Sequence, residues 1–165
     1  MKTLCAALLI ISVSFPAMPP AGKSPVKTAS FRNQILNEVN RLRARGCRCG
    51  TIDYPPAPPL RWNTLLEQSA RVHARDMRRR RFFSHTGSDG SNATQRIKRQ
   101  GYLSAQYGTW LTAENIAFGY PSIKRVIYEW QISPGHCRNM MNPAMQEMGA
   151  AEIDRYWVQD LGMRR

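Results

Sequence analysis

The cysteines carry the most reactive chemistry in this sequence. Cys5 lies in an apolar N-terminal run, whereas Cys47, Cys49 and Cys137 lie further along the chain. In an oxidising compartment these three cysteines predict one disulfide and one thiol that stays free or pairs with another molecule. The Cys47-x-Cys49 spacing could instead bind a metal, but zinc sites usually have two residues between such cysteines, and the sequence has no second cysteine pair.

Positive charge is the second chemical feature. The formal net charge is +13, and four arginines follow one another at Arg78, Arg79, Arg80 and Arg81. This charge favours anionic partners, and these four arginines are the candidate contact. They could equally be the solvated end of a helix, where arginines complement the helix dipole. Nucleic acid is an unlikely partner because no aromatic residues are interleaved with the arginines.

The N-terminus predicts export. Lys2 precedes the apolar run 5–15, and small residues and prolines follow up to Gly22, which is the layout of a signal peptide over residues 1–22. The apolar run is too short for a membrane-spanning helix, so we expect no anchor after cleavage and a secreted or periplasmic protein. Residues 23–30 are predicted to form a linker, and residues 31–165 a single domain.

The periodicity of the apolar residues predicts helices followed by strands. Helices are expected over residues 31–45, 63–77, 92–100 and 121–130. Strands are expected over residues 113–119, 147–153 and 156–161, the last two forming an antiparallel hairpin. Residues 50–59 are rich in proline and predict an extended surface connection. This order favours an α+β fold in which helices cover a small antiparallel sheet.

Individual polar residues can be placed on these elements. Arg43 is expected on or beside the solvent side of the first helix. His73 falls on the apolar or boundary face of the second, where a lone histidine is more often a hydrogen-bonded core residue than a ligand. Phe82 and Phe83 are expected to anchor the following loop in the core and so to hold His85 in place. The sequence has neither a Gly-x-Ser-x-Gly nor a His-Glu-x-x-His motif.

Three segments together resemble the bacterial pattern of the CAP superfamily, also called SCP-like extracellular proteins. They are residues 82–86, 114–117 and 130–142. Shorter matches extend the resemblance from about Ile35 to Gly162, and they include Cys49-Gly50, residues 58–63, residues 73–77, Ser88-Asp89-Gly90, Gly101-Tyr102, Glu147-Met148-Gly149 and residues 156–159. The order and number of these matches make the resemblance specific.

The resemblance implies an α-β-α sandwich with a shallow cleft that collects His85, Glu114 and His136. These three groups could ligate one divalent metal such as zinc, or form a hydrogen-bonded cluster in which the carboxylate fixes the imidazole tautomers. The pattern of eukaryotic members has a second glutamate where this sequence has Ser133. Glu129 is not a replacement, since it is expected on a different helical face.

The resemblance also implies a disulfide and a broad function. Cys49 is the better match to the half-cystine of the family, its expected partner is Cys137, and Cys47 is then the spare thiol; the alternative is a one-residue register swap, in which Cys47 takes the place of Cys49. We expect a secreted ligand-binding or interaction module whose partner is unknown, with an anionic envelope polymer or a lipid as candidates. The alternatives are a metal-dependent hydrolase that uses the same cleft, and a sterol- or lipid-binding protein. No motif of the sequence requires an enzyme.

Overall fold

The computed structural model describes residues 25–165, so the predicted signal peptide lies outside the described residues. The first helix, α1, spans Pro25–Arg45. Residues 25–30, which we expected to belong to a linker, are therefore helical. Proline is compatible with this start because the first turn of a helix needs no backbone N–H donor from it.

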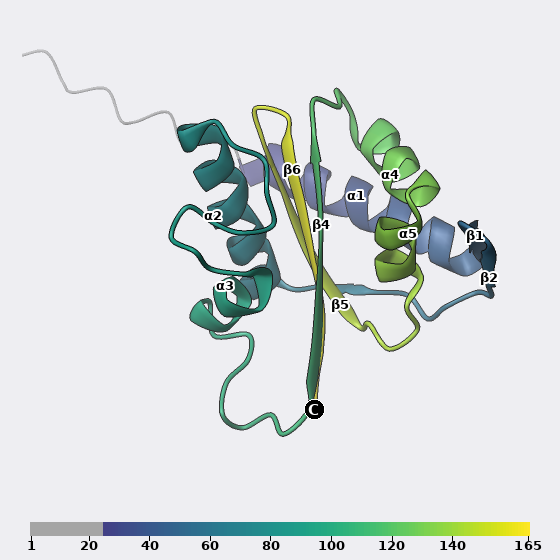
Figure 1. Cartoon of the computed structure of the whole chain (residues 1–165). Coiled ribbons are helices and arrows are strands. Elements are labelled where there is room, and N and C mark those ends of the chain that lie inside the picture. The colour runs from purple at the N-terminus through teal and green to yellow at the C-terminus, as the bar shows by residue number, and fades with distance from the viewer. Residues whose placement is uncertain (1–24) are drawn as a thin grey trace, which may run out of the picture.

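The domain is a three-layer sandwich around one four-stranded sheet. The strand order is β3 (Arg61–Trp62), β5 (Glu147–Ile153), β6 (Tyr156–Arg164) and β4 (Trp110–Phe118). The long strands pair antiparallel, and the short β3 adds a parallel pair beside β5. Helices α2 (Thr64–Arg80) and α3 (Ala93–Arg99) cover one face, and α1, α4 (Ile123–Ile132) and α5 (Pro134–Met141) cover the other (Figure 1). The predicted α-β-α sandwich is confirmed.

Local signals explain where several elements begin. The side chain of Asn63 accepts hydrogen bonds from the backbone N–H groups of Leu65 and Leu66 and so caps α2, as its sequence position indicated. Asn92 and Gln95 form a reciprocal capping box at the start of α3. Because Gly149 on β5 has no side chain, α2 can approach the sheet closely; a Cβ there would overlap the backbone of α2.

Two elements differ from the sequence prediction. Residues 133–135 were expected to close a helix, but Pro134 opens a new one, α5. A Ser-Pro-Gly sequence fits a turn, and it also fits a helix start in which proline occupies the first turn. The expected extended connection over residues 50–59 includes β2 (Ile52–Tyr54), which pairs antiparallel with β1 (Cys47–Cys49).

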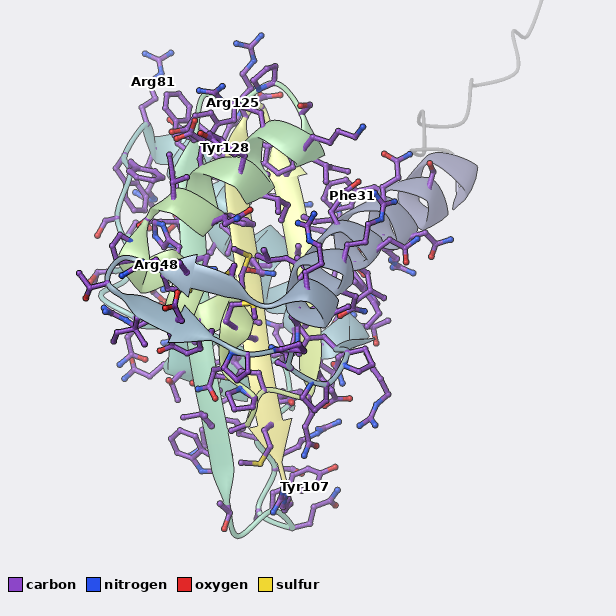
Figure 2. All side chains as sticks on the ribbon, turned by 90° about the vertical axis from the view of Figure 1, so that its right-hand side faces the viewer. Phe31, Arg48, Arg81, Tyr107, Arg125 and Tyr128 are labelled. Carbon is purple, nitrogen blue, oxygen red and sulfur yellow. A yellow bond between two sulfur atoms is a disulfide. The ribbon has the colours of Figure 1, made fainter. Side chains whose placement is uncertain are left out.

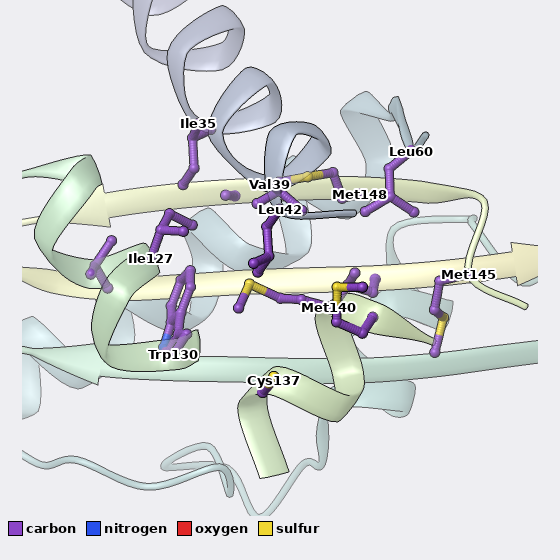
Figure 3. Close-up of a cluster of buried hydrophobic side chains, with 14 of the residues drawn as sticks. Ile35, Val39, Leu42, Leu60, Ile127, Trp130, Cys137, Met140, Met145 and Met148 are labelled. Carbon is purple, nitrogen blue, oxygen red and sulfur yellow. The ribbon is translucent and has the colours of Figure 1, made fainter. Parts of the chain in front are cut away.

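The larger apolar core lies between the sheet and helices α1, α4 and α5 (Figure 3). Its largest fully buried side chains include Leu42, Trp130, Met140 and Met148. Arg43 is buried in the same region, so its expected position at the solvent side of α1 was wrong. Its guanidinium donates to the backbone carbonyls of residues 58, 140, 142 and 145, and burial lowers its pKa to about 10.

Candidate functional site

The expected cleft residues come from three different parts of the fold. His85 lies in the loop between α2 and α3, Glu114 on β4, and His136 on α5. β4 is an edge strand, with α3 on one side of it and α4 and α5 on the other (Figure 1). Side chains of α4 and α5 cover this edge: Trp130 Nε1 donates to the carbonyl of Ile116 at 3.2 Å, and Asn139 Nδ2 donates to the carbonyl of Glu114 at 3.3 Å.

His85 and Glu114 are in direct contact. His85 Nδ1 lies 2.8 Å from Oε1 of Glu114, and Arg96 donates to the other oxygen, Oε2, at 2.7 Å. The His85 side chain is 57% exposed, whereas those of Glu114 and Arg96 are almost fully buried. Arg96 also donates to the carbonyls of His85 and Ser91. One buried ion pair therefore positions an exposed imidazole and the loop that carries it.

A second buried carboxyl lies next to Glu114. Asp160 on β6 is its cross-strand partner, and it is fully buried. Burial, followed by the charge of Glu114, raises the pKa of Asp160 well above its ordinary value. Burial also acts to raise the pKa of Glu114, but the hydrogen bond with His85 and the charge of Arg96 outweigh it and hold that pKa below its ordinary value. The two neighbouring carboxyls thus have pKa values shifted in opposite directions, which favours the ionised form of Glu114 over that of Asp160.

His73 has the structural role that the sequence indicated. It is fully buried in α2, and its Nε2 lies 2.9 Å from the backbone oxygen of Ser84, next to His85. Burial lowers its pKa and so favours the neutral ring. His73 therefore supports the loop of His85 and is not exposed to a ligand in the cleft.

His136 lies in the first turn of α5 and is held by a covalent link at the next residue. Cys137 is bonded to Cys49, as the resemblance implied, and Cys47 is the free cysteine within residues 25–165. The carbonyl of His136 also accepts a hydrogen bond from Asn115 Nδ2 at 3.2 Å. Burial, and then the charge of His85, lower the pKa of His136. The neutral imidazole is therefore favoured.

The two histidines and Glu114 do not form a ready three-ligand metal site. Both Glu114 oxygens are already engaged, one by His85 and one by Arg96. A metal site needs several ligand atoms close together. Within residues 25–165, the histidine, cysteine or acidic side chains whose ligand atoms all lie within 4.8 Å of one another are the three cysteines, and not the residues of this cleft. A metal held by His85, Glu114 and His136 would need Oε1 of Glu114 to give up its hydrogen bond with Nδ1 of His85, whereas Oε2 could stay paired with Arg96. In this arrangement the three side chains are therefore not preassembled around an ion.

An apolar groove of about 570 Å³ adjoins His136. Phe83, Phe118 and Ile132 line it, and each is more than half exposed. Phe83 was expected to anchor its loop in the core; instead Phe82 packs inward and Phe83 lies 6.4 Å from Phe118, measured between ring centroids. Glu129 also lines the groove, although it was expected on a different helical face. By contrast, Arg125 and Tyr128 lie on the outer surface of α4 (Figure 2).

The four consecutive arginines do not form one patch. Arg78 donates to Asp154 in the hairpin turn at 2.6 Å, and Arg81 is the left-handed C-cap of α2. Arg79 and Arg80 instead line a cavity of about 300 Å³ between α2 and the loop that leads to α3. Arg75 and Arg99, which sequence reasoning did not select, line the same cavity. For Arg75 the available signal was its spacing of four residues from Arg79, which places both on one face of the helix; no local signal marked Arg99.

Comparison with known proteins identifies the family. The sequence model described as CAP, the cysteine-rich secretory protein family, matches residues 36–156. This chain therefore belongs to the CAP family. A relative, the uncharacterised protein YkwD of Bacillus subtilis, is 29% identical over 138 residues, which are 82% of this chain and 48% of the relative. The chain spans about half the length of this curated relative.

Solved structures share the fold at low sequence identity. An extracellular SCP-domain protein of Bacillus anthracis has a TM-score of 0.63 at 22% identity, over 86% of this chain and 44% of its own. An outer surface protein of Borrelia burgdorferi has a TM-score of 0.62 at 21% identity, over 87% of this chain and 96% of its own. A cysteine-rich secretory protein of Staphylococcus aureus has a TM-score of 0.60 at 20% identity, over 85% and 40% of the two chains. Among the described residues, no helix is long and apolar enough to cross a membrane.

Proposed function

We propose that this protein is a secreted binding module that holds an amphipathic ligand in the groove beside His136. The observation that carries this proposal is the clustering of exposed apolar side chains. Of the seven large apolar residues with high exposure among those described, Phe83, Phe118 and Ile132 line this one groove. Exposed apolar clusters of this kind mark binding sites more often than isolated residues do.

The polar groups at the groove favour a ligand with a head group. His136, Ser133 and Glu129 line the same groove as the apolar residues. A neutral imidazole and a hydroxyl can donate and accept hydrogen bonds, so they suit an alcohol, carboxyl or ester group attached to an apolar chain or ring. This chemistry agrees with the lipid-like ligand that the sequence left as a candidate. Relatives named as extracellular or outer surface proteins support secretion.

The arrangement gives less support to a hydrolase. Catalysis by a serine would need its hydroxyl within hydrogen-bond distance of a histidine base. In the described part of the chain, no hydrogen bond joins a serine hydroxyl to the ring of His85 or His136. A metal-dependent reaction would need a ligand set, and in this arrangement Oε1 of Glu114 is hydrogen-bonded to the ring of His85. A binding role needs neither feature.

Fluorescence titration with a dansyl-labelled fatty acid tests the proposal. We expect the wild type to bind the probe and Phe83→Ser/Ile132→Ser to bind it at least tenfold more weakly, because each side chain contributes about 1.5 kcal/mol or more when buried by a ligand. Ile52→Ser is the matched control, since Ile52 is 50% exposed on β2 and does not line the groove. Equal affinities of the double variant and the control would refute the proposal, as would no binding by the wild type.

The cavity of Arg75, Arg79, Arg80 and Arg99 favours a second role, contact with an anionic envelope polymer. Asp76 and Asp89 also line it, and they pair with Arg80 and Arg99. Arg75 and Arg79 have no ion-pair partner among the described side chains, so they carry the unbalanced positive charge of this cavity. Like charges four residues apart destabilise a helix, which an anion between Arg75 and Arg79 would relieve.

Binding of a soluble heparin fragment, used as a model polyanion, tests this second role. We expect affinity to fall steeply with salt and to drop in Arg75→Ser/Arg79→Ser. Arg125→Ser/Arg48→Ser is the control, because it removes the same charge from exposed sites elsewhere. An equal loss in both variants would show that net charge alone attracts the polymer and would overturn the assignment to this cavity.

A further inference from the structure

Three sulfur atoms lie together where β1 meets α5. The Cys47 sulfur is 3.5 Å from that of Cys137 and 3.8 Å from that of Cys49, and the latter two form the disulfide. Cys49 and Cys137 are fully buried, whereas Cys47 is partly exposed. The free thiol is thus in van der Waals contact with a disulfide that solvent does not reach directly.

We propose that Cys47, Cys49 and Cys137 form a thiol–disulfide exchange centre in which Cys47 attacks the sulfur of Cys137. The Cys47 thiol first loses its proton to solvent. The thiolate then forms a bond to the Cys137 sulfur while the bond between Cys137 and Cys49 breaks, and Cys49 leaves as a thiolate that takes up a proton. One disulfide and one thiol are present before and after the step, so no external oxidant or reductant is needed.

Strand geometry selects Cys137 over Cys49 as the sulfur that is attacked. Attack on Cys49 would create a disulfide between Cys47 and Cys49, two residues apart on β1. The Cα atoms of such residues in a strand are about 6.6 Å apart, near the upper limit for a disulfide. Attack on Cys137 joins two different elements instead, and its sulfur is the nearer one.

Exchange requires a small movement of Cys47. A thiolate attacks along the axis of the disulfide, but the similar distances to both sulfurs place the Cys47 sulfur beside that axis. Rotation of the Cys47 side chain, or displacement of β1, would bring it into line. Burial raises the pKa of the Cys47 thiol, and the charge of Arg45 acts in the opposite direction. Exchange is therefore expected to be slow at neutral pH and faster in alkaline solution.

The exchange keeps α5 attached to β1. In either isomer Cys137 is bonded to a cysteine of β1, so His136 remains one residue from a covalent link. The isomers differ in which cysteine of β1 holds α5. Gly50, in the turn after β1, lies close to the start of α5: a Cβ added to this glycine would be 3.2 Å from the side chain of Pro134. Exchange is thus expected to shift the first turn of α5, which carries His136, relative to β1.

Mapping the free thiol in the intact oxidised protein tests the exchange. The protein is incubated in mildly alkaline buffer, then trapped in acidic denaturant with excess N-ethylmaleimide so that buried thiols are capped before digestion. Trypsin places the three cysteines on separate peptides, 46–48, 49–61 and 126–138. We expect the label on Cys47 at first and on both Cys47 and Cys49 after incubation. Label on Cys47 alone at every time would overturn the proposal.

Two variants separate exchange from scrambling during trapping. Cys49→Ser is expected to form the disulfide between Cys47 and Cys137 and to show no label at either of them; label on both in this variant would also overturn the proposal. Cys47→Ser keeps the disulfide between Cys49 and Cys137 and should show no label at either of these two cysteines. If the distribution in the wild type changes when the maleimide concentration is raised, the label reflects scrambling in the trap, and the exchange is rejected. These outcomes do not depend on which ligand the groove binds.

Discussion

The two faces of the sheet are stabilised by different interactions. Against α1, α4 and α5 most contacts are apolar, with Leu42, Trp130 and Met140 fully buried, and a disulfide ties α5 to β1. The one buried charge described on this side, Arg43, is bonded to backbone carbonyls and not to a carboxylate. Against α2 and α3 the sheet also presents Glu114 and Asp160, which are both buried. Packing on the apolar face mainly stabilises the fold. On the polar face, buried charged groups lower the stability of the fold but hold His85 in place. Stability and site geometry should therefore respond differently to substitutions on the two faces.

The largest loss is expected on the apolar face, from Trp130→Ala. Trp130 is 1% exposed, and truncation of a buried tryptophan costs about 3 to 5 kcal/mol, because burial and packing are both lost. Urea unfolding measures this difference. Tyr128→Ala, an exposed position on the same helix, is the control and should change the free energy of unfolding by less than about 0.5 kcal/mol. Equal effects would mean that α4 is not packed as described.

On the polar face, Arg96→Met is expected to cost about 3 kcal/mol, because it leaves Glu114 buried without its ion-pair partner. The loss should also be local. The loop of residues 84–92 loses the bonds that Arg96 makes to His85 and Ser91, so its backbone amides should exchange with deuterium faster than those of α4.

Arg99→Met is the matched control for this loop. Arg99 lies on the same helix and pairs with Asp89, but both side chains are more than half exposed, so the expected cost is below about 1 kcal/mol. If Arg99→Met loosened the loop as much as Arg96→Met, the buried ion pair would not be what positions His85.

Local signals in the sequence were enough for much of the fold. The asparagine before α2 and the turn between β5 and β6 identified their elements, since caps and turns depend on a few neighbouring residues. The buried charges could not be found in this way. Nothing near Arg43 or Arg96 in the sequence distinguishes them from exposed arginines; their burial depends on carbonyls and a carboxylate from distant segments.

The residues of the candidate site also fall into those that the sequence could identify and those that only the tertiary structure reveals. The resemblance supplied His85, Glu114 and His136, and the structure joins His85 to Glu114 while His136 lies on the other helical layer. The groove was missed because Phe83 and Ile132 have the residue types of a core, and only the tertiary structure leaves them exposed. Asp160 was missed because a single acidic residue in a predicted strand has no local partner that would mark it.

Asp160→Asn is expected to have a smaller effect and, unlike the substitutions above, to increase the free energy of unfolding relative to the wild type as the pH rises. The raised pKa means that folded Asp160 keeps its proton at pH values where the unfolded chain has released it, so the free energy of unfolding falls as the pH rises above about 4. An amide cannot ionise, so this contribution disappears in the variant. Urea unfolding of both proteins across this range should show the variant gaining relative to the wild type as the pH rises. A constant difference would mean that Asp160 titrates normally.

The smallest expected change is in the pKa of His136, which responds to His85 on the opposite side of the sheet. Part of the lowered pKa of His136 comes from the charge of His85, so His85→Gln should move the pKa of His136 upward, though not to its ordinary value, because burial remains. Proton NMR can follow this directly, since the chain has three histidines. His73 is an internal comparison: burial is the main cause of its lowered pKa and the charge of His85 is not among the causes, so its signal should move less than that of His136. An unchanged pKa of His136 would mean that the two imidazoles are too far apart to act on one ligand.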